Sequence, residues 1–295
     1  MGDTVCCLPV ATALKQAFPE SHITWLVDPR FQAVVECCPS VDETVPYRPS
    51  FGIPPKLEPF ELAFDLQGLF KSAWPVLWVK ATEKFGYHWQ REGAALASRR
   101  VLPDPTSVHI VDQYLDVARA AGATVDRAEF NLTPAPGEAD KLRPKLGGAE
   151  RLVVLNPGAG WITKRWPPES FAALADAVTG MGATPVLIGG NAAADSAAAE
   201  EVISRCSSKP VNLVGQTSIT GLIALIAMAK AHVGGDTGSS HIAAALGIPA
   251  IGLYGITNPA RSCPYGQIER CHYEPAGLAK IAPAVVIETV AEALA

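Results

Sequence analysis

The chain has 295 residues, 48% of them hydrophobic, and a formal net charge of −5. This composition is ordinary for a globular protein, and the length accommodates two domains of about 100–200 residues each. The acidic net charge disfavours nucleic-acid binding, which needs a basic surface, so we expect no nucleic-acid partner. No apolar run approaches the ~18–20 residues of a membrane-spanning helix, and the amino-terminal residues lack the pattern of a signal peptide.

The cysteines favour reduced thiols in a cytoplasmic protein. Their spacing fits neither a disulfide framework nor the C-x-x-C pattern of a zinc site. Acidic residues and histidines also lack convincing metal-ligand spacing, so we expect neither a metal nor a cofactor. The cysteines stand at positions 6, 7, 37, 38, 206, 263 and 271.

The first half of the chain alternates between predicted helices and short strands. Apolar residues at helical spacing predict a helix over 4–18, and a second clear helix covers 108–122, with Gly122 as its C-cap. Pro75 should kink or end a third helix. The remaining predictions are strands at 22–27 and 61–68 and helices at 29–38 and 69–80.

Residues 131–150 carry three prolines and three glycines, and we place a domain boundary within them, at 140. The alternation beyond it indicates βαβ units and parallel sheets. We therefore expect an α/β protein with two Rossmann-like domains, 1–140 and 141–283, facing a cleft, and a terminal helix at 284–295 that packs back on the first domain. The predicted strands of the second half are 151–158, 183–190, 211–214, 231–235 and 249–255, and its helices are 167–182, one ending near 206, 219–230 and one following residue 236.

The polar turn "GGDTGSSH" lies where a predicted strand gives way to a helix. Thr237 or a neighbour can cap the helix, whose first N–H groups would suit a phosphate. Gly238 leaves room for such a guest, and His241 follows about one turn later. Taken alone, this turn is more often a helix cap, and His241 could be a structural histidine.

A second polar segment, "NPGAGWITKRWPPESF", follows the strand at 151–155. Lys164 is placed to neutralise a diphosphate, with Arg165 as a further candidate. A lone Lys-Arg pair is usually solvated surface, but ligands bind at the carboxyl ends of parallel strands, where these segments converge. Neither G-x-G-x-x-G nor G-x-x-x-x-G-K-[ST] is present, which disfavours nicotinamide oxidoreductases and P-loop kinases.

"LNPGAGWITKRWPPESFAALA", followed by "GGDTGSSHIAAALGIPAIGLYGITNPARSCPYG", resembles glycosyltransferase family 9, the ADP-heptose:lipopolysaccharide heptosyltransferases. "FDLQGLFKSA" and "GYHWQREGAALASRRV" look most like the type I enzymes. The resemblance implies a GT-B fold and a metal-independent, inverting transfer of heptose from ADP-heptose to the Kdo of the inner lipopolysaccharide core. Its lipid acceptor also implies a peripheral contact with the inner face of the inner membrane.

The resemblance also assigns roles to individual residues. Donor-binding residues would be Lys164, Asp236, Thr237, Gly238 and His241. The general base would be Asp3, for which a helix cap is the simpler interpretation. Lys71 and Arg91 would face the anionic acceptor of the Kdo-lipid A type.

Three departures from the family pattern keep alternatives open. The chain begins at the Asp3 motif, so the family's first strand is missing, which suggests a nucleotide-sugar-binding protein made inactive by truncation. The loop at 47–60 offers only Arg48 and Lys56 as basic residues, which suggests another acceptor or donor, as in types II and III. No residue clearly matches the family's ribose-contacting acid, although Asp195 lies nearby.

Overall fold

The computed structural model describes residues 1–48, 54–158 and 165–295. Residues Asp3–Leu132 and Thr133–Ala295 form two compact units. The boundary thus lies at 132 rather than at the expected 140. The difference arises because part of the Pro- and Gly-rich segment folds with the second unit: helix α5 (Glu138–Leu142) packs on α8 (Ile219–Met228), and Leu142 and Leu146 are buried.

The first unit is organised around helix α1 (Gly2–Ala17), which is buried on all sides from Val5 to Leu14. A helix surrounded by protein carries apolar residues all round, as this one does. Thr12 Oγ1 lies 3.1 Å from Ser40 Oγ, which ties the helix to the segment before the second strand. Pro9 lies inside the helix without ending it.

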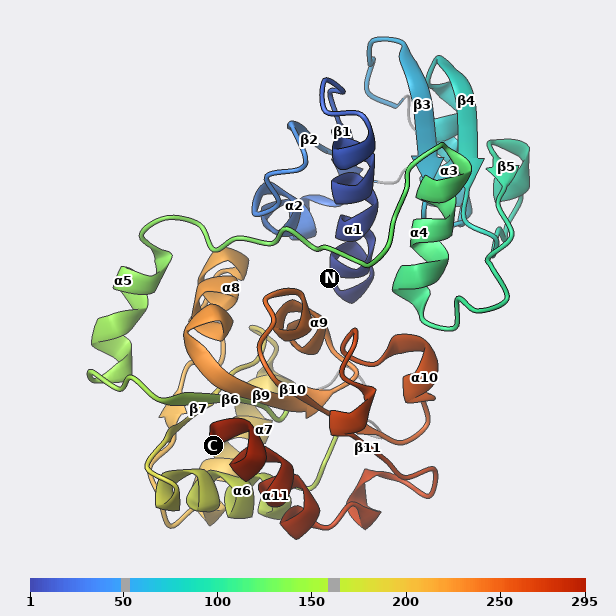
Figure 1. Cartoon of the computed structure of the whole chain (residues 1–295). Helices are drawn as coiled ribbons and strands as arrows, with labels where there is room; N and C mark the ends of the chain where they lie inside the picture. Colours follow the sequence, from blue (N-terminus) through green and yellow to red (C-terminus); the bar gives the residue numbers. More distant parts are fainter. Residues whose placement is uncertain (49–53, 159–164) are drawn as a thin grey trace. The chain divides into compact units, whose positions relative to one another are not determined.

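Two parallel sheets complete the first unit: the pair β1-β2 and the three-stranded sheet β3-β4-β5 (Figure 1). Helix α3 (Phe70–Trp78) follows β3, and α4 (Ile110–Ala120) ends before Gly122, whose φ of +98° suits glycine. Pro75 lies within α3 rather than ending it. The other elements are β1 (Thr24–Val27), α2 (Gln32–Glu36), β2 (Glu43–Pro46), β3 (Phe60–Asp65), β4 (Ala81–Gly86) and β5 (Arg99–Arg100).

The second unit is a six-stranded parallel sheet with the order β11-β10-β9-β6-β7-β8. When the six strands are numbered 1 to 6 in chain order and read from the β8 edge, the order is 3-2-1-4-5-6. This is the doubly wound arrangement, in which the order reverses between the first and fourth strands. Its strands are β6 (Leu152–Asn156), β7 (Thr184–Leu187), β8 (Val211–Asn212), β9 (Ala229–Gly235), β10 (Ala250–Tyr254) and β11 (Cys271–Tyr273).

Helices cover both faces of this sheet, as Figure 1 shows. Helix α6 (Pro168–Gly180) packs against both α7 (Ala193–Arg205) and α11 (Pro283–Leu294), and α8 packs against α9 (Gly238–Ala245). The short α10 (Pro259–Ser262) follows β10. The terminal helix α11 was expected on the first domain, but it packs against α6, β9 and β10 and buries Val286, Val290 and Leu294 there.

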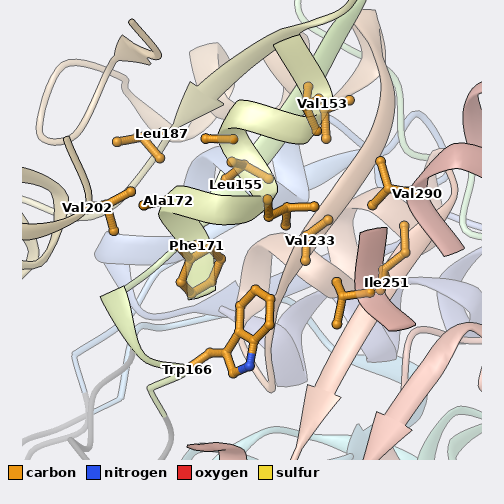
Figure 2. Packing of buried hydrophobic residues seen from close by; sticks show 14 of the residues in the cluster. Val153, Leu155, Trp166, Phe171, Ala172, Leu187, Val202, Val233, Ile251 and Val290 are labelled. Carbon is orange, nitrogen blue, oxygen red and sulfur yellow. The ribbon is translucent and has the colours of Figure 1, made fainter. Parts of the chain in front are cut away.

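The main core of the second unit fills the space between the sheet and the layer of α6, α7 and α11 (Figure 2). Trp166 and Phe171 lie at its edge with their rings 5.1 Å apart in an edge-to-face arrangement. The Trp166 indole N–H donates to the carbonyl oxygen of Ile281 at 3.0 Å. Its hydrogen-bonding group is therefore satisfied, as burial of an indole requires.

Candidate functional site

The site with the strongest geometric support lies in the second unit, where the strand order reverses. Strands β6 and β9 are neighbours, with Asn156 paired to Gly234 near their carboxyl ends. Because the connections that follow two such strands lead to opposite faces of the sheet, they leave a crevice between them. The chain places its two polar segments, "NPG" after β6 and "DTGSSH" after β9, at this crevice.

A hydrogen-bond network joins the two segments across the crevice. The Asn156 Nδ2 group donates to Ser239 Oγ at 2.9 Å and to Thr237 Oγ1 at 3.3 Å. On the other side of the same amide, Asn156 Oδ1 accepts from the backbone N–H of Gly158 at 3.2 Å. One side chain therefore fixes the turn after β6 relative to the first turn of α9.

A fully buried histidine on β9 also contacts this network. His232 Nε2 lies 2.9 Å from Ser239 Oγ, while its Nδ1 has no hydrogen-bond partner. Burial, and to a lesser degree the charge of His241, lower the pKa of His232 from 6.5 to about 3. The imidazole is therefore neutral at neutral pH. Nothing in the sequence pattern singled out His232, because an isolated histidine in a strand carries no motif.

The amino-terminal turn of α9 presents backbone N–H groups at the crevice. Thr237 occupies the N-cap position, but its side chain makes no capping hydrogen bond. Its hydroxyl instead lies 3.0 Å from Ser239 Oγ. The orphan N–H groups of the turn and the positive end of the helix dipole form an arrangement that binds anions. Thr237 thus occupies the N-cap position without capping the helix through its side chain. The turn therefore remains suited to a phosphate.

Asp236 and His241 lie together beside this turn. His241 Nε2 is 3.8 Å from Asp236 Oδ1, and both side chains are largely buried. A small pocket beyond the ends of β9 and β10 is lined by Asp236, Tyr254 and Thr257, among others. Asp236, Thr237, Gly238 and His241 thus lie together at the start of α9, and their role in donor binding stays a prediction.

The structure describes only one of the two candidate basic residues after β6. Lys164 lies outside the described residues. Arg165 does not stand alone as a surface charge: its guanidinium lies 3.9 Å from Asp195 Oδ1 and donates to the Ala194 carbonyl at 3.4 Å. Asp195 also accepts from the Gly190 N–H at 3.0 Å. A Cβ at Gly158 would stand 2.7 Å from Asp195 Oδ1, so a larger residue there would require the Asp195 side chain to shift.

In the first unit, Lys71 lies in the first turn of α3, and Arg91 lies in the loop after β4, which touches the start of that helix. The Arg91 N–H donates to the Gly68 carbonyl at 2.8 Å, and the Phe70 N–H donates to Glu92 Oε2 at 3.3 Å. Gly68 has a φ of +68°, and a Cβ there would lie 2.4 Å from the Trp89 carbonyl oxygen. These contacts bring exposed Lys71 and Arg91 to the same end of the β3-β4-β5 sheet.

Two aspartates of the first unit differ in burial. Asp3 is exposed and lies in the first turn of α1, whose N-cap is Met1, so the cap interpretation of Asp3 is wrong. Asp65, which the sequence reasoning missed, is buried at the end of β3. Its Oδ1 accepts from the N–H groups of Gln67 and Gly68, and burial raises its pKa. Its position at a strand end was the available signal.

The family of the chain follows from comparison with known proteins. Residues 56–278 match glycosyltransferase family 9 (heptosyltransferase), which is more than half of the chain. The chain belongs to this family. It is therefore a glycosyltransferase, as the sequence motifs predicted.

Curated relatives of this family 9 glycosyltransferase carry several heptosyltransferase names. It is 24% identical over 279 residues to the lipopolysaccharide core heptosyltransferase OpsX of Haemophilus influenzae, covering 91% of this chain and 80% of the relative. It is 29% identical to lipopolysaccharide heptosyltransferase 1 of Pseudomonas aeruginosa, covering 90% and 79% respectively. Lipopolysaccharide heptosyltransferase 3 of Escherichia coli is 28% identical, covering 87% and 80%.

Solved structures show the same fold at low identity. A family 9 glycosyltransferase from Veillonella parvula gives a TM-score of 0.85 at 21% identity and covers 99% of this chain and 94% of the other. E. coli heptosyltransferase WaaC with ADP gives 0.80 at 24%, covering 99% and 97%. The predicted α/β class with parallel sheets, the GT-B class of these neighbours, is confirmed.

Metal sites and membrane spans can be judged over residues 1–48, 54–158 and 165–295. Within those ranges, no group of three or more His, Cys, Asp or Glu side chains is arranged to hold a metal ion. The helices of the same ranges include none that is both long enough and apolar enough to cross a bilayer.

Acidification should weaken the second unit through His232. The native pKa of about 3 lies below the value of 6.5 expected when unfolded. Between these values the unfolded chain binds the extra proton, so the stabilisation is complete above pH 6.5 and is lost as pH falls toward 3. We expect this residue to lower the free energy of unfolding by about 2 kcal/mol between pH 7 and pH 5.

Urea unfolding at both pH values, compared with His232→Gln, isolates this contribution. Glutamine does not titrate, and its amide can still hydrogen-bond toward Ser239, so the variant should lose about 2 kcal/mol less over the same range. All other titrating groups are common to the two proteins. Equal pH dependence in both proteins would show that His232 is not buried in neutral form.

Proposed function

We propose that this chain transfers L-glycero-D-manno-heptose from ADP-heptose to the Kdo of the inner lipopolysaccharide core, with inversion and without a metal ion. The supporting observation is the anion-binding arrangement at the reversal point of the β6-β9 pair, joined by the Asn156–Ser239–Thr237 network. Family membership, together with the ADP carried by the structural neighbour WaaC, supports a nucleoside diphosphate as the anion.

We assign the two parts of the donor, its diphosphate and its heptose, to different groups around α9. The diphosphate belongs at the N–H groups of Gly238 and its neighbours, because a helix N-terminus stabilises negative charge. The Asp236 carboxylate would repel a phosphate but accepts hydrogen bonds from sugar hydroxyls, so we assign it to the heptose. His241, 3.8 Å away, orients that carboxylate. Lys164 would neutralise the diphosphate.

The first unit supplies the acceptor side of the reaction. Lys71 and Arg91 would bind the anionic Kdo, because a guanidinium and an ammonium both pair with carboxylates. Asp3 would accept the proton of the attacking hydroxyl as its oxygen bonds to the anomeric carbon. The bond between that carbon and the phosphate oxygen breaks at the same time, and ADP leaves from the opposite face.

An assay of ADP release tests this function directly. ADP-heptose and Kdo-lipid A are incubated with the chain in the presence of EDTA, and the expected result is stoichiometric ADP and heptosylated lipid. Turnover that requires an added divalent cation would contradict the metal-independent mechanism. Binding of ADP without any product would instead favour a nucleotide-sugar-binding protein.

A second candidate keeps the family and changes the acceptor. The observation that favours it is the similar identity, between 27% and 29%, to relatives named heptosyltransferases 1, 2 and 3. Offering Kdo-lipid A and an already heptosylated core in parallel separates the two. Because either acceptor is a lipid, we place the enzyme in the cytoplasm at the inner face of the inner membrane, as a peripheral protein.

A further inference from the structure

Helix α3 of the first unit has an unusual outward face. Phe70, Trp74 and Trp78 are spaced by four residues, so they lie along one side of the helix. Their rings form a continuous row, with centroids 5.7 Å apart for the first pair and 5.6 Å for the second. Leu77, seven residues after Phe70, falls beside this row.

The opposite side of α3 is the side that packs. Ala73 and Val76 are buried against Ala94 and Ala97 at the short 3-10 helix that follows β4. The aromatic row lies on another side of the helix, where Phe70 and Trp74 are half-buried and the carboxyl end is exposed. Trp78 is 63% exposed and Leu77 is 47% exposed, although a surface helix normally turns polar residues outward.

Positive charge predominates in the segment that carries this face. Residues 70–100 contain six lysines and arginines and two glutamates, a net charge of +4 in a chain whose total is −5. Lys71 and Lys80 are exposed, and Lys84 Nζ donates to the Leu77 carbonyl at 3.1 Å, which places it at the end of the helix. Lys71 and Lys80 thus stand near the two ends of the row, and Lys84 reaches its carboxyl end.

We propose that the face of α3 formed by Phe70, Trp74, Leu77 and Trp78 docks on an anionic phospholipid surface. Tryptophan rings favour the boundary between headgroups and acyl chains, and neighbouring lysines are attracted to anionic lipids. This inference deepens the proposed function, since Lys71 on the same helix is assigned to a lipid-linked acceptor. A second copy of the chain fits less well, because an isologous contact would bring the lysines of both copies together.

Sedimentation with vesicles tests the proposal without either substrate. Wild-type protein is mixed with phosphatidylcholine vesicles that contain or lack phosphatidylglycerol, and the bound fraction and the blue shift of tryptophan fluorescence are measured. We expect binding to the anionic vesicles only, weakened by high salt. The double variant Leu77→Ser/Trp78→Ser should bind at least tenfold more weakly, because two apolar side chains no longer enter the interface.

A charge variant keeps the test valid if the double variant fails to fold. Lys80→Glu should reduce vesicle affinity by at least about fivefold, since each basic residue near an anionic surface contributes on that scale. Exposed residues of the second unit provide matched controls, Ile268→Ser and Lys209→Glu, which should bind like wild type.

Three outcomes would overturn the proposal: absence of wild-type binding, equal binding by the α3 variants, or a wild-type dimer that only these variants dissociate. Turnover with a soluble Kdo acceptor, measured in parallel, shows separately whether the proposed reaction holds. Vesicle binding without turnover would leave the lipid-docking face standing while the transferase proposal fails.

Discussion

Asp3→Asn should lower kcat by about 10²–10⁴-fold, which is the contribution expected of a general base. The carboxylate is exposed in the first turn of α1, so the amide replaces it without disturbing buried contacts. An amide of the same shape cannot accept the proton of the attacking hydroxyl. Because the assigned diphosphate site lies on α9, the dissociation constant of ADP should be unchanged.

Steady-state kinetics and ADP titration calorimetry on the same preparations check this prediction. Asp126→Asn, which removes another exposed carboxylate of the first unit, is the matched control and should keep full kcat. Full activity in Asp3→Asn would remove Asp3 from the mechanism, and loss of ADP binding would make its role structural.

Trp166→Ala should destabilise the second unit by about 3–5 kcal/mol, the usual cost of deleting a large buried aromatic side chain. The indole is 2% exposed, packs edge-to-face on Phe171 and donates to the Ile281 carbonyl. Its loss leaves a cavity and a carbonyl without this donor. Such a cost is a large fraction of the ~5–15 kcal/mol by which domains are stable.

Urea unfolding measures this loss of stability, and two further variants serve as references for its size. Trp166→Phe keeps most of the packing and loses the hydrogen bond, so it should cost about 1–3 kcal/mol. Trp89→Ala removes a tryptophan that is 48% exposed, and its cost should stay below ~1 kcal/mol. Trp166 is also two residues after Lys164 in the chain. We therefore expect folded Trp166→Ala, measured without urea, to bind ADP more weakly than the wild type. A cost below ~1 kcal/mol for Trp166→Ala would contradict the packing in Figure 2.

The central strands of the second unit were predicted because they are buried on both faces, whereas β11, which has no buried residue, was missed. Strands β6 and β10 consist almost wholly of buried residues, so they appear as apolar runs in the sequence. Strand β4, "ATEKFG", was missed because its first half exposes Thr82 and Glu83. It is a strand because β3 and β5 pair with its backbone on either side, which no local pattern shows.

The sequence likewise did not show which parts of the chain α5 and α11 pack against. The segment 131–150 looks like a linker by composition, yet Leu142 and Leu146 anchor it to the second unit. The helix near the carboxyl end was predicted correctly, whereas the partner of its apolar side was not. Helical periodicity shows that a face is buried but carries no information about what buries it.

By itself, the sequence determined the family and the alternating α/β class, because these are local: short motifs and apolar periodicity. It also predicted the group Asp236, Thr237, Gly238 and His241, which are adjacent in the chain. The tertiary structure alone decided that Asn156 and Ser239, 83 residues apart, hydrogen-bond across the reversal point. It also decided that His232 is fully buried and that Leu77 and Trp78 of α3 are exposed. Burial and long-range hydrogen bonds depend on the order of the strands and the packing of the helices, and neither is written in any one segment of the chain.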